Sequence, residues 1–127
     1  MDGGLTIPLL FTYKRRFKLR TLKFIVDNQI VKPDPNCDFE NLVPGTEEYI
    51  QAEFSFSSEW NGCVKVASFW SILGKEYPAQ ALKDGKTCII PIEALNRRSF
   101  KMQLIGKNKK IKLTTNKLTI NQNGGGV

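Results

Sequence analysis

The sequence contains no histidine, and this absence excludes several classes of enzyme. Ser-His-Asp triads, Cys-His dyads and histidine general bases are impossible without it, and most catalytic zinc sites use histidine ligands. The phosphate-binding motif GxxxxGK(S/T), the dinucleotide-binding motif GxGxxG and the nucleophile-elbow motif GxSxG are missing as well. We therefore expect a protein that is not an enzyme, with no catalytic residue, no cofactor and no metal site.

Two pairs of carboxylates are the remaining candidates for acid–base chemistry, Glu47 with Glu48 and Glu53 with Glu59. A glycosidase-like pair needs a cleft and a raised pKa on one member. Glu47 and Glu48 precede a strand and follow a turn, where a solvated charge is the commoner explanation. We therefore assign no catalytic role to either pair.

Cysteine is scarce, and its spacing excludes two further kinds of site. Cys37, Cys63 and Cys88 are far apart and form no CxxC pair, which fits neither a disulfide framework nor a zinc site. Reduced thiols and synthesis in a cytosol are the expected state. Cys63 and Cys88 lie in apolar runs and are expected in the core, whereas Cys37 lies in a polar loop and is expected to be exposed.

Long hydrophobic runs are also absent, so no membrane contact is expected. The apolar segment Leu5–Phe11 is interrupted by Pro8 and is far too short to span a bilayer. Its positive charges follow the apolar part, which is the reverse of a secretory signal. Residues 1–17 are interpreted either as an arm that adds a strand to a neighbouring subunit or as an extension from an alternative start codon. The partner-binding candidates in this arm are Leu5, Ile7, Leu9, Phe11, Tyr13, Arg15 and Arg16.

Acidic residues are missing from the last quarter of the chain, and the net charge of +7 is unevenly distributed. Residues 27–95 contain eleven acids and five bases, whereas residues 96–127 contain eight bases and no acid. A basic surface of this kind can bind a polyanion such as nucleic acid. Alternatively, acidic and basic faces complement one another between copies, or simply keep the protein in solution.

The basic residues cluster at two expected turns, which adds five candidates for partner binding: Arg97, Arg98, Lys107, Lys109 and Lys110. Basic residues at the turns between strands contact phosphate groups of nucleic acids in some proteins. Stacking aromatic residues would strengthen that interpretation, but only Phe100 is near, and its alternation places it in the core. Nucleic acid is therefore the less favoured partner, and the lysines can instead prevent strands of different molecules from pairing.

The clearest structural signal lies between Tyr49 and Trp70, and it predicts two strands joined by a polar corner. Apolar and polar residues alternate from Ile50 to Phe56, with the period of two that is typical of a half-buried strand. Asn61-Gly62 provides a turn before the apolar run resumes. We expect Trp60 to close one end of a sheet-on-sheet core.

The preceding residues predict a hairpin followed by a long loop. Leu22, Phe24 and Val26 alternate with Lys23 and Ile25, and a turn is expected at Asp27-Asn28. The proline-rich connection from Lys32 to Glu48 is expected to be a surface loop. Its two large apolar residues are candidates both for anchoring the loop and for binding a partner: Phe39 and Leu42. The loop is either a contact element in an assembly or a solvated decoration.

The second half of the chain completes the expected fold. Pro91 is expected to open a short helical turn that ends at Leu95. Phe100, Met102 and Leu104 predict a strand, Gly106 to Lys109 a turn, and Leu118 with Ile120 a last strand. Together these signals predict an all-β fold, an antiparallel β-sandwich of seven to nine short strands. The expected organisation is an arm at 1–17, a sandwich domain at 18–122 and a Gly-rich tail at 123–127.

Three segments resemble small structural proteins encoded by Firmicutes-type phages: FSFSSEWNGCVKVASF, DGKTCIIPIEALNRRSFKMQLIG and KLTTNKL. The residues that match the tail and baseplate β-domains of that family are Phe54, Phe56, Ser57, Glu59, Trp60, Gly62, Phe69, Cys88, Ile90, Pro91, Thr115 and Asn116. The similarity covers residues 18–122. It implies an immunoglobulin-like or baseplate-type sandwich that serves in virion assembly. Family members usually begin near Lys18, so residues 1–17 depart from the pattern.

The sequence therefore suggests a non-enzymatic virion structural protein of a tail, baseplate or capsid decoration, made in the bacterial host cytoplasm and located in the virion. Its partners would be other virion proteins or copies of itself, bound through shape, charge and strand addition. The alternative is a small phage-encoded inhibitor that binds a host defence nuclease, similar in kind to anti-CRISPR proteins. Direct binding of nucleic acid is a third hypothesis.

Overall fold

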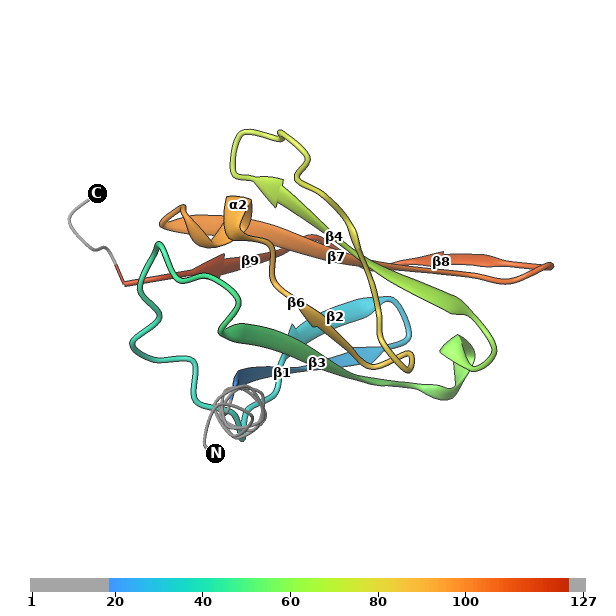
Figure 1. The fold of residues 1–127 in the computed structure, drawn as a ribbon. Coiled ribbons are helices and arrows are strands. Elements are labelled where there is room, and N and C mark those ends of the chain that lie inside the picture. Colours follow the sequence, from blue (N-terminus) through green and yellow to red (C-terminus); the bar gives the residue numbers. More distant parts are fainter. Residues whose placement is uncertain (1–18, 124–127) are drawn as a thin grey trace, which may run out of the picture.

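A computed structural model describes residues 19–123 and shows nine strands with two short helical segments (Figure 1). The strands form two sheets around one buried core, so the predicted all-β sandwich is confirmed. The four-stranded sheet contains β1 (Arg20–Asp27), β2 (Ile30–Pro33), β3 (Ile50–Phe56) and β6 (Thr87–Ile89). The five-stranded sheet contains β4 (Val64–Ser71), β5 (Gln80–Ala81), β7 (Ser99–Lys107), β8 (Lys112–Thr114) and β9 (Leu118–Asn121).

The predicted arm at residues 1–17 lies outside the described residues, and so does the predicted tail except for Asn123. Seven of the partner-binding candidates belong to this arm: Leu5, Ile7, Leu9, Phe11, Tyr13, Arg15 and Arg16. Their roles stay predictions.

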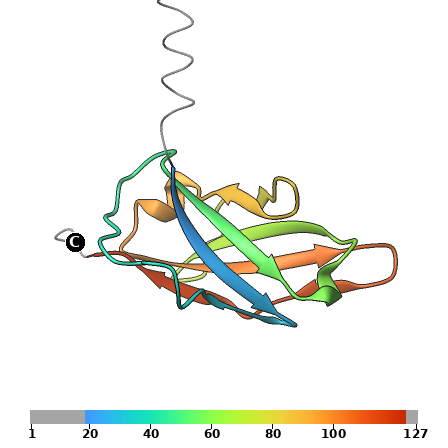
Figure 2. The same cartoon turned by 90° about the horizontal axis from the view of Figure 1, so that it is seen from below.

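Alternation along the strands places the apolar side chains between the sheets, as the sequence predicts. Leu22, Phe24 and Val26 of β1 are buried, and β2 returns after a turn in which Asn28 has a φ of 54°. The rings of Phe24 and Phe54 stack with their centroids 5.4 Å apart. Figure 1 shows the two sheets edge-on as separate layers, and Figure 2, seen from below, shows β1 and β3 in front of the five-stranded sheet.

One strand pair differs from the antiparallel arrangement that we predicted. β1 and β3 run parallel, in register from Arg20 opposite Ile50 to Val26 opposite Phe56, whereas all the other pairs among the described strands are antiparallel. A parallel pair needs a long crossover connection. Here β2 and the loop of residues 34–49 together bring the chain back to the start of β1. The length of that loop therefore has a topological cause.

The corner after β3 carries the chain from one sheet to the other, so β3 and β4 are not paired with each other. A 3₁₀ turn, η1 (Ser58–Trp60), buries Trp60 completely, which confirms its predicted place in the core. The indole Nε1 donates a hydrogen bond of 2.7 Å to the carbonyl of Asn28. Gly106 lies under the indole ring within β7, although we expected it in a turn.

Two further elements position the surfaces described below. Pro91 precedes the short helix α2 (Ile92–Leu95), as predicted. Asn116, which follows β8, links the two sheets along one side. Its side-chain amide pairs with the backbone of Val31 in β2, as the backbone of a neighbouring strand would. Its Oδ1 accepts a hydrogen bond of 2.8 Å from the backbone N–H of Val31, and its Nδ2 donates to the Val31 carbonyl.

Candidate interaction surfaces

The loop of residues 34–49, called here the acidic loop, carries five acids and no base: Asp34, Asp38, Glu40, Glu47 and Glu48. Its apolar residues hold it on the sandwich. Leu42 is only 2% exposed, and the ring of Phe39 packs edge-on against Phe24 at 5.3 Å. The prediction that Phe39 and Leu42 anchor the loop is confirmed. The prediction that Leu42 binds a partner is wrong, because a core side chain presents no surface.

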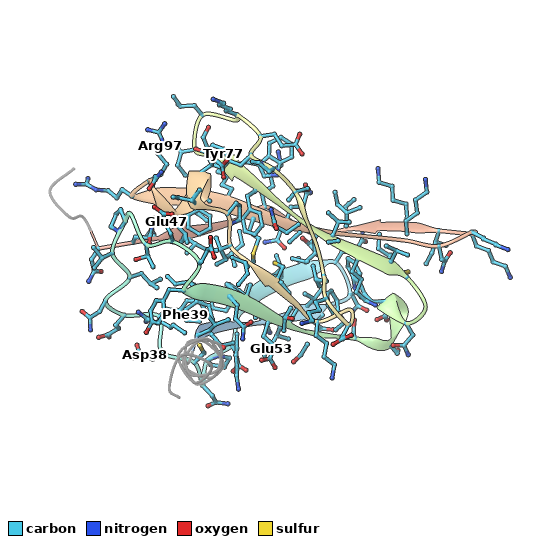
Figure 3. All side chains as sticks on the ribbon, in the orientation of Figure 1. Asp38, Phe39, Glu47, Glu53, Tyr77 and Arg97 are labelled. Atoms are coloured by element: carbon cyan, nitrogen blue, oxygen red, sulfur yellow. The ribbon has the colours of Figure 1, made fainter. Side chains whose placement is uncertain are left out.

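Hydrogen bonds to its backbone groups fix the same loop at several points. The guanidinium of Arg20 donates to the carbonyls of Asp38, Glu40 and Asn41. The N–H of Gly45 donates to the carbonyl of Leu95 at the end of α2, at 2.8 Å. The carboxylates at positions 38, 40, 47 and 48 are exposed, and Figure 3 shows Asp38 and Glu47 at separate points of the loop. The acidic loop is therefore an ordered, negatively charged surface.

The β7–β8 connection forms a second charged surface, the basic hairpin of residues 107–112. Lys107, Lys109 and Lys110, which we predicted to bind a partner, are exposed here together with Lys112. Asn108 orders the turn, because its Oδ1 accepts hydrogen bonds from the backbone N–H groups at positions 110 and 111, at 2.7 and 2.9 Å. Figure 1 shows this hairpin protruding at the end of the molecule opposite to the acidic loop.

A third surface is a hollow of about 570 Å³ between the β4–β5 and α2–β7 connections, called here the end hollow. Buried Tyr77 lines it, and the predicted partner-binding residues Arg97 and Arg98 line it from the α2–β7 connection and are exposed. Figure 3 shows Tyr77 and Arg97 at this end of the sandwich. Ile72 and Leu73 form the opposite side, and Leu73 is 98% exposed.

The sequence analysis missed the apolar side of the end hollow. The signal was available, because Ile72 and Leu73 stand directly before Gly74 in a turn, where large apolar residues are unusual. It also missed that the strands of the five-stranded sheet carry four lysines and no acid: Lys65, Lys101, Lys107 and Lys112. Beside this sheet, the Nζ of Lys117 lies 3.7 Å above the ring of Trp70, a cation–π contact.

Glu59, a member of one of the two carboxylate pairs, is shifted away from the behaviour of a catalytic acid. Hydrogen bonds from the Ser57 side chain and from its own backbone N–H lower the pKa of Glu59, so this carboxyl stays ionised at neutral pH. A general acid needs the opposite shift. Among residues 19–123, no group of three or more Cys, Asp or Glu side chains is placed to hold a metal ion.

Cys37, Cys63 and Cys88 form no disulfide with one another in this structure. Cys63 and Cys88 are buried, as predicted. Cys37, expected to be exposed, is half-buried, because its Sγ accepts a hydrogen bond from the backbone N–H of Lys23 at 3.3 Å. Burial raises the pKa of the Cys88 thiol from 9.0 to about 12.

This shift predicts a loss of stability at alkaline pH. Below pH 9 the Cys88 thiol is protonated in both the folded and the unfolded state, so it adds no pH dependence. Between about pH 9 and 12 the unfolded chain releases the proton and the folded chain keeps it, so the free energy of unfolding falls as pH rises. Urea unfolding at pH 8 and pH 10.5 should show a smaller decrease for Cys88→Ala than for the wild type. An equal decrease in both proteins would contradict this assignment.

Comparisons with protein-family models, curated proteins and solved structures returned no match to this chain. Within residues 19–123, no helix has the length and the apolar character needed to cross a membrane. The three surfaces defined above are therefore the basis for a functional proposal.

Proposed function

We propose that this chain is a non-enzymatic structural protein of a phage virion, which assembles in several copies into a tail, baseplate or capsid decoration. The observation that carries the proposal is the apolar turn of Ile72 and Leu73 beside the end hollow. The Leu73 side chain is 98% exposed, so a partner that removes it from water lowers the free energy of the complex. Apolar groups gathered at a polar-rimmed hollow are typical of a protein-binding surface.

Hydrogen bonds hold the apolar side of this surface in place. The backbone N–H of Ser71 donates to the carbonyl of Lys75 at 2.7 Å, and the Ser71 Oγ accepts from the Lys75 N–H at 2.9 Å. The N–H of Gly74, whose φ is 99°, closes the turn on the Ser71 carbonyl. Because the turn is already ordered, little conformational entropy is lost when it docks.

The arginine side of the hollow is equally constrained. Buried Gln122 donates from its Nε2 to the carbonyls of Leu95 and Arg97, at 2.9 and 2.7 Å. Its backbone N–H donates to the carbonyl of Arg98 at 2.7 Å. The two guanidinium groups and Lys75 therefore surround an apolar surface with positive charge. A partner that combines an apolar side chain with neighbouring carboxylates fits this arrangement.

The proposal can be tested by incorporation into particles. We expect Ile72→Asp/Leu73→Asp to fold like the wild type, because both side chains are exposed, with a change in unfolding free energy within about 1 kcal/mol. We expect the variant to be lost from purified particles by about tenfold or more when it replaces the wild type during infection. Ala79→Asp, which adds an acid at an exposed position of the same β4–β5 connection, is the matched control and should be incorporated normally.

Two results would contradict the proposal. One is equal incorporation of both variants, and the other is absence of the wild-type chain from particles although infected cells contain it. The alternative proposal, an inhibitor of a host defence nuclease, predicts that second result together with inhibition of the nuclease by the purified chain.

A further inference from the structure

The acidic loop and the basic hairpin lie at opposite ends of the folded body. The acidic loop carries five carboxylates and no base, and the basic hairpin carries four lysines and no acid. Both views show the loop and the hairpin at the two ends of the long axis of the sandwich (Figures 1 and 2). Within one molecule these surfaces face away from each other. Two different copies can bring them together.

Both ends also expose large aliphatic side chains among their charges. Val43 of the acidic loop is 53% exposed. At the other end Ile111 is 45% exposed, and Val64, which pairs with Lys107 across β4 and β7, is 73% exposed. The loop and the hairpin therefore each combine apolar surface, which supplies affinity, with residues of one charge sign, which supply orientation and a fast encounter. Arg97 and Arg98 lie at the same end of the body as the acidic loop but belong to the end hollow.

We infer that the acidic loop of one copy docks on the basic hairpin of a second copy, so that molecules join head to tail. The inference rests on the proposed function and names the partner within the assembly. Because the two surfaces differ, the contact is heterologous, and its repetition closes a ring or extends a filament. Both surfaces are held by internal hydrogen bonds, so docking requires little rearrangement.

Two features favour a second copy over nucleic acid as the occupant of the hairpin. Stacking platforms for bases are exposed aromatic rings, and residues 107–112 contain none. The ring of Trp70, the aromatic residue on the outer side of β4, is already covered by Lys117.

The test uses two charge-reversed full-length chains. The loop-reversed chain carries Glu40→Lys, Glu47→Lys and Glu48→Lys, and the hairpin-reversed chain carries Lys109→Glu, Lys110→Glu and Lys112→Glu. All six side chains are exposed, so both chains should fold. In sedimentation velocity at low salt we expect the wild type to self-associate and each reversed chain alone to be monomeric. An equimolar mixture should associate again, because each loop then meets a hairpin of opposite charge.

A control separates a specific contact from general charge attraction. Lys32→Glu/Lys83→Glu/Lys86→Glu changes three exposed lysines outside both surfaces, so it has the same net charge as the hairpin-reversed chain but an intact basic hairpin. On its own it should self-associate like the wild type, whereas the hairpin-reversed chain should not. Wild-type association should weaken by about tenfold between 50 and 500 mM salt.

Several outcomes would overturn the inference. They are a wild type that is monomeric at high concentration, reversed chains that associate like the wild type, a mixture that stays monomeric, or a control chain that is as monomeric as the hairpin-reversed chain. Binding of a short DNA oligonucleotide that is lost on hairpin reversal, without self-association, would identify nucleic acid as the occupant instead. A monomeric wild type that is nevertheless found in particles would refute the head-to-tail contact alone. A self-associating chain that is absent from particles would refute only the virion role.

Discussion

Replacing Gly106 by alanine is expected to lower the free energy of unfolding by about 2–3 kcal/mol, within the range for overpacked cores. A Cβ at this position would lie 2.6 Å from Cε3 and 2.7 Å from Cζ3 of Trp60. The indole cannot move aside easily, because it is completely buried and its Nε1 is held by the carbonyl of Asn28. Urea unfolding of the variant and the wild type measures the difference.

A matched variant separates this steric clash from other effects of removing a glycine. Gly74→Ala places a Cβ where no atom lies within 4 Å, but on a backbone with φ of 99°, so it reports backbone strain without a clash. Shortening the indole by Trp60→Phe should make the cost of Gly106→Ala smaller than in the wild type, because the clashing ring atoms are gone. Additive costs in the double variant would contradict the proposed contact.

Truncating Leu42 to alanine is expected to lower the free energy of unfolding by about 3 kcal/mol. This side chain is 2% exposed and belongs to the core cluster, so its loss leaves a cavity below the acidic loop. The loop should also open more often, because Leu42 is its deepest anchor. A glutamate-specific protease should then cut the loop at Glu40, Glu47 or Glu48 at least several-fold faster than in the wild type, since local opening exposes the cleavage sites.

Val43→Ala is the control for this experiment, since the neighbouring valine is 53% exposed and carries little of the packing. We expect a change within about 0.5 kcal/mol and an unchanged cleavage rate. If Leu42→Ala and Val43→Ala behaved alike, the acidic loop would not be anchored as described. The docking surface that we infer from it would then lack a fixed shape.

Local signals predicted most of the fold correctly. The alternation of Leu22, Phe24 and Val26 identified the buried face of β1, and Pro91 marked the start of a helical turn. Such patterns can be recognised in the sequence because they are local. Side chains of a strand alternate with a period of two, and proline restricts the backbone at its own position and next to it. The burial of Trp60 followed from its position between two strongly apolar strands.

Pairings between distant segments could not be read in the same way. The sequence does not record that β1 runs parallel to β3 or that β3 and β4 lie in different sheets, because both depend on how the whole chain packs. Gly106 was expected in a turn because glycine is common there, whereas its actual role depends on an indole more than forty residues away. The end hollow was missed for the same reason, since its two sides come from separate connections.

The candidate surfaces were predicted in part. The lysines of the basic hairpin and the pair Arg97 and Arg98 stood out because charged residues at turns remain in solvent. Leu42 was assigned two roles, and only burial distinguishes an anchor from a contact residue. The placement of the acidic loop and the basic hairpin at opposite ends of the body could be seen only in the three-dimensional arrangement (Figure 1).

The most direct test of the account is to count the copies of this chain in purified particles by quantitative peptide mass spectrometry. A structural component that joins its own copies should be present in a fixed number greater than one per particle, and this number should not vary between preparations. Particles without the chain, or with less than one copy on average, would contradict the account.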